Sequence, residues 1–248
     1  MEKKSRSKTS YLSKSLYIKG LQCHKALWLI KNQPELKAEI SATQQAMFDT
    51  GTETGILAQG LFPDGVEIPY AGLSHIEQLA KTQEALNNGE RTIYEATFSF
   101  DNVFVKIDIL HKAMTGWEIY EVKSSTRCKD VYLEDIAVQY HVVVGTGLSI
   151  ARTCLVHLNN QYVRNGDIEV DKLFSIQDVT EAVLSRQPTV TSNLTTMRAV
   201  LGGTLPTVDI GPHCSTPYEC EFTGHCWGDI PIDSVFDIRD IGKPDVTL

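Results

Sequence analysis

The chain has 248 residues, of which 42% are hydrophobic and 22% charged, and its formal net charge is -8. This composition is ordinary for a globular protein with a sizeable core and excludes a largely disordered chain. The negative charge argues against a protein that coats nucleic acid through a broad basic surface, but it allows an enzyme with a local basic groove. No apolar run approaches the ~18 residues of a membrane span, and the first residues contain no signal region, so we expect a cytoplasmic protein without a membrane contact.

One domain with an extension at each end is the expected organisation. Residues 1–14 carry basic side chains among serines and are expected to be a basic flexible arm, which either touches phosphates or only increases solubility. Residues 15–228 are expected to form the folded domain. Residues 229–248 are polar and rich in turn formers, which predicts a C-terminal tail.

Helical periodicity dominates the first third of the chain. Residues 13–31 are predicted to form one helix that begins at an N-cap serine, so Cys23 should project from it. Residues 41–60 and 74–87 are predicted to form two more helices, and residues 66–69 a short strand between them.

The period changes from about 3.6 to 2 after residue 90, which indicates a sheet. Strands are predicted over residues 92–100, 103–112 and 117–124, and their connections are short enough to force antiparallel hairpins. A helix over residues 131–144 and a strand over 151–159 complete an α-β-β-β-α-β core of the mixed α/β class. Further along, we expect a hairpin turn at residues 165–166 and a helix that starts at residue 179 and resumes after Pro188.

Two acidic residues and a lysine lie on the central strands. The alternating apolar residues from Val103 to Ile109 are expected to share one face, which leaves Asp108 on the other. Glu121 and Lys123 are two residues apart and share a face. A turn centred at residues 114–116 then places Asp108 opposite Glu121 or Lys123.

Paired carboxylates repel each other unless a hard cation such as Mg²⁺ or Mn²⁺ lies between them. A lysine beside them completes a hydrolytic site, since the metal activates water and the ammonium steadies the phosphoryl group. Glu95 on the preceding strand could add a ligand or hold a water, and Asp135 and Gln139 lie one helical turn apart, so both can face the site. The alternative is a solvent-facing hairpin with salt-bridged charges beside a polar helix surface.

Four of the six cysteines form a second constellation. Three are spaced five residues apart near the end of the chain, and Pro and Gly residues between them bend the chain around a centre. With the early cysteine they could hold a [4Fe-4S] cluster that joins both ends of the domain. Zinc is the rival, because His24, His213 and His225 neighbour these cysteines, although Cys-x2-Cys hooks are absent. The four candidate ligands are Cys23, Cys214, Cys220 and Cys226.

Both constellations together resemble the PD-(D/E)xK superfamily, which has a restriction-endonuclease-like core. Within it, the chain is similar to RecB-like nucleases with an iron-sulfur cluster, such as AddB and CRISPR-associated RecB-family exonucleases, and to an uncharacterised bacterial family of this type. The matching stretches are residues 94–96 (YEA), 105–110 (VKIDIL) and 120–125 (YEVKSS), Gln139, the opening residues 12–15 (LSKS), and the cysteine-containing residues 214–220 and 225–227.

This resemblance implies a role for each matched residue. It implies Asp108 and Glu121 as ligands of Mg²⁺ or Mn²⁺, Lys123 as the catalytic lysine, Gln139 as a helix residue near the site, and the four cysteines as ligands of a [4Fe-4S] cluster. The chain departs from the family pattern at Ala58 and Gln59, where a histidine ligand is common, at Val143, where a tyrosine is expected, and in the wide spacing of its cysteines.

Three functions remain open from the sequence. The first is a Mg²⁺- or Mn²⁺-dependent DNA exonuclease that acts on single strands or DNA ends and could have a helicase or another DNA-processing protein as its partner. The second is a non-catalytic iron-sulfur module that binds nucleic acid or serves as a scaffold. The third is a redox-sensing cluster protein whose affinity for DNA follows the state of its cluster.

Overall fold

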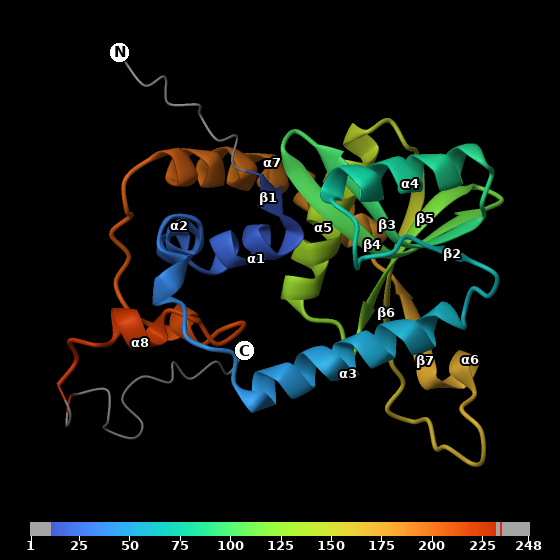
Figure 1. Cartoon of the computed structure of the whole chain (residues 1–248). Helices are drawn as coiled ribbons and strands as arrows, with labels where there is room; N and C mark the ends of the chain where they lie inside the picture. Colours follow the sequence, from blue (N-terminus) through green and yellow to red (C-terminus); the bar gives the residue numbers. More distant parts are fainter. Residues whose placement is uncertain (1–10, 232–233, 235–248) are drawn as a thin grey trace.

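The computed structural model of the chain describes residues 11–231 and 234. It is a mixed α/β protein in which one seven-stranded sheet is flanked by helices (Figure 1). The strands are β1 (Leu12–Ser13), β2 (Val66–Glu67), β3 (Thr92–Phe100), β4 (Val103–Ala113), β5 (Gly116–Lys123), β6 (Ile150–Leu158) and β7 (Phe174–Asp178). The helices are α1 (Lys14–Gln22), α2 (His24–Asn32), α3 (Ala42–Gln59), α4 (His75–Asn87), α5 (Asp130–Gly145), α6 (Val170–Leu173), α7 (Thr180–Gly202) and α8 (Thr223–Cys226), with 3-10 turns η1 (Pro34–Leu36) and η2 (Pro212–Cys214).

The sheet has the strand order β2-β3-β4-β5-β6-β7, and β1 pairs with β4 beside this path. Strands β3, β4 and β5 form an antiparallel meander, as the short connections predict. Asp101 and Asn102 join β3 to β4 with φ values of 49° and 58°, the left-handed conformation that a two-residue hairpin turn requires. Helix α5 then crosses over so that β6 runs parallel to β5. No helix within residues 11–231 is long and apolar enough to cross a membrane.

Strands β4 and β5 are paired along only part of their length. Their ladder runs from Ala113 opposite Gly116 to Ile109 opposite Tyr120, and beyond that point β5 continues beside β6. The first residues of β4 pair instead with β1 in parallel, Leu12 opposite Val103. The two central strands therefore fork, and the start of the described chain enters the same part of the sheet.

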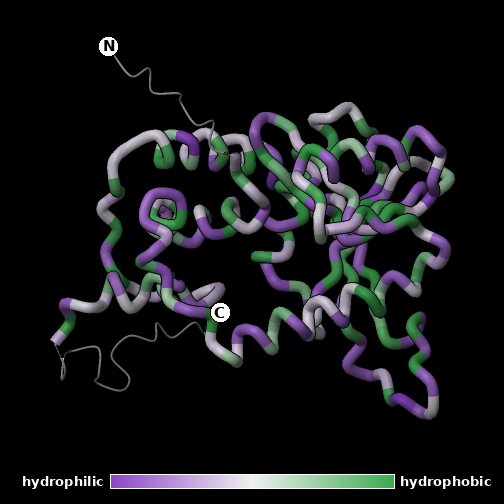
Figure 2. Tube along the Cα trace, viewed as in Figure 1, coloured by the Kyte–Doolittle hydropathy of each residue, from purple (hydrophilic) through white to green (hydrophobic). Residues whose placement is uncertain are grey.

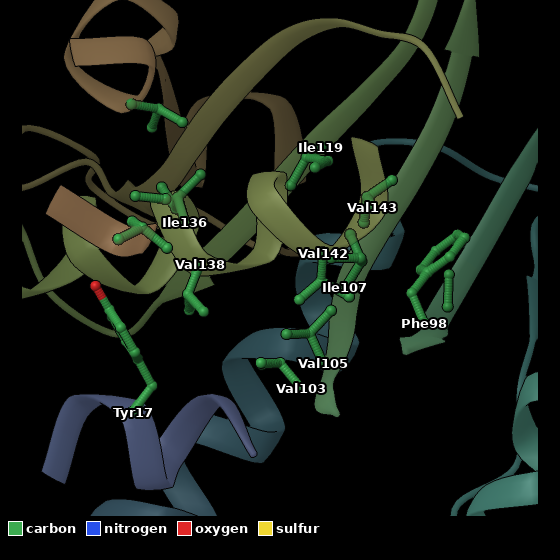
Figure 3. Packing of buried hydrophobic residues seen from close by; sticks show 14 of the residues in the cluster. Tyr17, Phe98, Val103, Val105, Ile107, Ile119, Ile136, Val138, Val142 and Val143 are labelled. Atoms are coloured by element: carbon green, nitrogen blue, oxygen red, sulfur yellow. The ribbon is translucent and has the colours of Figure 1, made fainter. Parts of the chain in front are cut away.

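Two apolar clusters cover the two faces of the sheet. On one face, α5 packs against β3, β4 and β6, and α7 packs on α5 and β6; Figure 3 shows Val105 and Ile107 near Val142 of α5. On the other face, Ala58 at the end of α3 packs with Tyr94, Ile109, Tyr120 and Cys154. Helix α3 mixes hydrophilic and hydrophobic residues along its length (Figure 2), and its only buried residues are Thr54 and Ala58.

The expected alternation of β4 is wrong at one position. Ile107 packs in the first cluster, but Ile109 packs in the second, so the apolar residues from Val103 to Ile109 do not share one face. The neighbouring strand changes face at the same level, where Glu95 has a φ of 55° and is not paired with β4, although Tyr94 and Ala96 on either side of it are. A left-handed residue inside a strand shifts the side-chain alternation by one, and for a non-glycine residue it costs about 1–2 kcal/mol.

Several expectations for the ends of the domain need correction. Residues 13–31 form two helices rather than one, because Cys23 is extended (φ -161°, ψ 117°) and caps both α1 and α2. Residues 1–10 of the expected basic arm lie outside the described residues, whereas residues 11–14 belong to the fold as β1 and the start of α1. Helix α7 runs through Pro188 without interruption. Of the expected tail 229–248, only residues 229–231 and 234 are described.

Candidate active site and cysteine cavity

Asp108 lies where β4 and β5 separate. Its Oδ2 accepts the backbone N–H of Val122 at 2.7 Å, on the segment of β5 that no longer pairs with β4. The carboxylate thus satisfies a donor that the fork would leave without a strand partner. The pairing of Ile109 with Tyr120 sets Asp108 at the level of Glu121, one of the two positions that the turn geometry predicts.

Glu121 is the most buried charged residue of the site, with 1% of its surface exposed. Its Oε1 accepts from Lys123 Nζ at 2.5 Å and from Lys14 Nζ at 3.0 Å. Its Oε2 accepts from Gln139 Nε2 at 2.6 Å and from Lys14 Nζ at 3.2 Å. Three donors from three different elements therefore hold this carboxylate in place.

Helix α5 contributes a further carboxylate. Asp135 Oδ2 accepts from Lys123 Nζ at 2.5 Å, and its Oδ1 lies 3.6 Å from Lys14 Nζ. Asp135 and Gln139 are one turn apart on the buried side of α5, so the helix presents both to the end of β5. We refer to these residues as the carboxylate cluster: Lys14, Asp108, Glu121, Lys123, Asp135 and Gln139.

Lys14 belongs to the carboxylate cluster, although its basic neighbours in the sequence predict that it is part of the flexible arm. The pairing of Leu12 with β4 and the N-cap at Ser13, whose hydroxyl accepts from Leu16 N, place Lys14 as the first residue of α1. The N-cap serine was a usable signal for this helix start. Lys14 differs from the other lysines of the expected arm because it lies in the predicted helix 13–31 and in the matching residues 12–15, but neither feature predicts its contact with the carboxylates.

The charges of the cluster shift each other's pKa values. Burial and the neighbouring Glu121 raise the pKa of Asp108 to about 7. Burial would also raise the pKa of Glu121, but the ammonium groups of Lys123 and Lys14 outweigh burial and hold it well below its ordinary value. Burial raises the pKa of Asp135 despite the same two lysines. The site therefore holds a firmly ionised Glu121 between carboxyls that bind protons more readily.

Glu95 lies beside the cluster rather than within its hydrogen bonds. It stands on β3 at the level of Asp108 on β4, between the pairs Tyr94–Ile109 and Ala96–Ile107. Burial raises its pKa, Lys106 and Lys14 oppose that rise, and Glu121 adds to it. The structure thus brings Asp108, Glu121, Lys123 and Gln139 together and places Glu95 next to them, on a residue with a strained backbone.

The oxygen donors of the cluster suit a hard divalent cation in chemistry. Asp135 Oδ1 and Gln139 Oε1 are buried and make no hydrogen bond within the described residues. In the same part of the chain, no group of three or more His, Cys, Asp or Glu side chains is already arranged as a set of metal ligands. The carboxylates converge instead on the two ammonium groups, so a cation would have to rearrange them.

The four cysteines of the second constellation line one cavity of about 20 Å³. All four are free thiols and half-buried. Phe222, which is fully buried, and Ala26 of α2 also line this cavity, and His213 reaches it with Nε2 3.8 Å from Cys214 Sγ. The four thiols fit a cluster or a zinc ion in chemistry, provided that they draw closer on binding. The lining residues from the expected ligand set are Cys23, Cys214, Cys220 and Cys226.

The cysteine segment, residues 211–228, is fastened to the first two helices by a few specific contacts. Gln22 Nε2 donates to the carbonyls of His213 at 2.7 Å and Tyr218 at 2.6 Å. Lys19 Nζ pairs with Glu221 at 2.6 Å. These contacts join the two ends of the domain, as the split cysteine set predicts. Cys154, by contrast, is fully buried in the core.

No family model and no curated protein matches the chain. Among solved structures, an alkaline exonuclease from Laribacter hongkongensis is similar, with 14% sequence identity, a TM-score of 0.40, and coverage of 77% of this chain and 90% of that chain. A likeness at this level assigns no activity, so the function has to be argued from the site.

Proposed function

We propose that the protein is a metal-dependent nuclease that hydrolyses phosphodiester bonds of DNA. The observation that carries the proposal is the meeting of Asp108, Glu121 and Lys123 at the fork between β4 and β5. The buried Glu121, the half-buried Asp108 and Lys123 form a polar site at the point where the two strands separate. A purely structural ion pair would not require a second carboxylate whose pKa is raised by the first.

In this proposal, Asp108 and Glu121 hold Mg²⁺ or Mn²⁺ through carboxylate oxygens. When bound, the metal lowers the pKa of water and neutralises charge on a phosphoryl oxygen. The Lys123 ammonium, held by Glu121 and Asp135, orients the attacking water or stabilises the charge that develops on phosphorus. Gln139 fixes Glu121 through Oε2, and Glu95 is a further candidate ligand or water holder.

The substrate class rests on the sequence motifs. Their resemblance to RecB-like exonucleases favours single-stranded DNA or DNA ends, with a helicase or another DNA-processing protein as partner. The net charge of -8 argues against a broad basic surface and allows a local basic groove.

We further propose that the four cysteines hold a [4Fe-4S] cluster with a structural role. The thiols share one small cavity that is largely apolar, and they come from opposite ends of the domain. Zinc remains the alternative, and His213 at this cavity is what favours it. Iron and zinc content of protein purified without oxygen, compared between wild type and Cys220→Ala, would decide between them.

A second candidate function is a non-catalytic nucleic-acid-binding module. The observation in its favour is that three donors already satisfy Glu121, as in a site kept for structure. The family's additional histidine is also replaced, by Ala58 or Gln59.

The test is cleavage of end-labelled single- and double-stranded DNA with Mg²⁺ or Mn²⁺. Wild type should release nucleotides, whereas Asp108→Ala should bind DNA and fail to cut it. Asp171→Ala, an exposed acid of α6, is the matched control and should cut like wild type. Wild-type protein that binds DNA but never cuts it with either metal would favour the module.

A further inference from the structure

Lys14 contacts three carboxylate oxygens of the site, one more than Lys123. Its Nζ lies 3.0 and 3.2 Å from the two oxygens of Glu121 and 3.6 Å from Asp135 Oδ1. A single ammonium that contacts both oxygens of one carboxylate and one oxygen of another stands where a cation shared by these carboxylates would stand.

The three donors to Glu121 differ in how firmly they are anchored. Lys123 is on β5 itself and also binds Asp135, and Gln139 is fully buried on α5. Lys14 reaches the site from the junction of β1 and α1, and 24% of its side chain is exposed. Its long stem can swing toward solvent while the backbone of β1 stays paired with β4. Lys14 is therefore the donor that can leave without dismantling the core.

We infer that Lys14 is an internal counter-ion that competes with the divalent cation for Glu121 and Asp135. This inference rests on the proposed metal-dependent function. The Lys14 ammonium donates its hydrogens to carboxylate lone pairs, and a hard cation binds the same lone pairs. The ammonium and the cation therefore cannot occupy these oxygens at the same time. Metal binding is then an exchange, in which the Lys14 ammonium leaves the carboxylates as the cation arrives.

The exchange predicts that removal of the Lys14 charge strengthens metal binding. Wild type must first release the Lys14 ammonium from Glu121 and Asp135, so Lys14→Met should bind Mn²⁺ at least about tenfold more tightly than wild type. Mn²⁺ affinity can be measured from the electron paramagnetic resonance signal of free Mn²⁺, without any substrate. Lys81→Met, at an exposed position of α4, is the control and should match wild type.

A second readout uses thermal stability. Without Mn²⁺, Lys14→Met should melt lower than wild type, because Glu121 and Asp135 lose a partner. Mn²⁺ should then raise its Tm by more than it raises that of wild type. If Lys14→Met does not fold, Lys14→Gln, which can still donate a hydrogen bond to Glu121, takes its place in both measurements. Lys14→Arg keeps the charge and should bind Mn²⁺ as weakly as wild type.

The outcomes distinguish the competition by Lys14 from the proposed metal-dependent nuclease function. Equal or weaker Mn²⁺ binding by Lys14→Met and Lys14→Gln, with wild type still binding, would overturn the competition and leave the metal site intact. An absence of Mn²⁺ binding in all variants would overturn the metal-dependent nuclease and this inference together.

Discussion

The carboxylate cluster and the cysteine cavity are built in opposite ways. The cluster sits among β4, β5, α5 and α1, and its buried charges are paired by hydrogen bonds within the fold. The cysteine segment has only η2 and α8 as regular structure, and a small apolar cluster of Ala26, Leu29 and Phe222 supports it. The first site is assembled by the sheet and its helices. The cysteine segment has little apolar core of its own, so its stability depends more on the group that its thiols bind.

The largest effect should come from breaking the cysteine side of this comparison. Cys220→Ala removes one proposed cluster ligand. By analogy with a disulfide that closes a loop as long as that from Cys23 to Cys214, loss of the cluster should lower the free energy of unfolding by at most about 5 kcal/mol. Denaturant unfolding under anaerobic conditions measures this loss. Cys128→Ala, outside the cavity, should change stability by less than about 1 kcal/mol. Equal stability of wild type and Cys220→Ala would show that the segment needs no bound group.

The next largest effect should come from breaking the carboxylate side. Glu121→Ala leaves Lys14 and Lys123 with Asp135 as their remaining carboxylate partner, and we expect a loss of about 3 kcal/mol, the lower end for a broken buried ion pair. Urea unfolding of the purified variant measures it. Glu169→Ala, which removes an exposed pair with Lys172, is the control and should cost less than about 1 kcal/mol. Similar losses in both variants would mean that Glu121 is no better satisfied than a surface residue.

The pH dependence of stability sharpens the description of the carboxylate cluster. Folded Asp108 keeps its proton up to a pKa of about 7, whereas the unfolded chain releases it near 3.8. The folded state therefore binds more protons between these values, and the free energy of unfolding falls as pH rises from about 4 to about 7. We expect Asp108 to contribute a fall of about 2 kcal/mol, less than a fully buried group would show. Unfolding curves of wild type and Asp108→Asn should diverge over this range; parallel curves would contradict the raised pKa.

The smallest effect concerns the connection of the cysteine segment to α1. Gln22→Ala removes both hydrogen bonds to the carbonyls of His213 and Tyr218, and we expect a loss of about 1–2 kcal/mol. Hydrogen exchange should show faster opening of residues 211–228, with β4 and β5 unchanged. Gln83→Ala, which loses only an exposed contact with Asn87, is the control. Uniform acceleration across the sheet would mean that the two regions unfold as one unit.

The sequence predicted the meander and the facing acids because both follow from local rules. Period-two alternation and short turns determine the strands, and the turn position determines that Asp108 faces Glu121. The alternation break at Glu95 could not be predicted, since a left-handed residue inside a strand is imposed by its surroundings and has no propensity signal. Lys14 was missed for a related reason. Its partners lie 107 and 121 residues away, and periodicity does not reveal such contacts.

Helix α1 has a mechanical consequence. Lys14, at its first residue, touches the carboxylates, and Gln22, at its last, holds the cysteine segment, so about 12 Å of hydrogen-bonded helix separates the two. Such a short helix transmits an axial push almost rigidly. Because the pairing of Leu12 and Ser13 with β4 fixes the start of this helix, the cysteine segment at its other end is held in register with the carboxylate cluster.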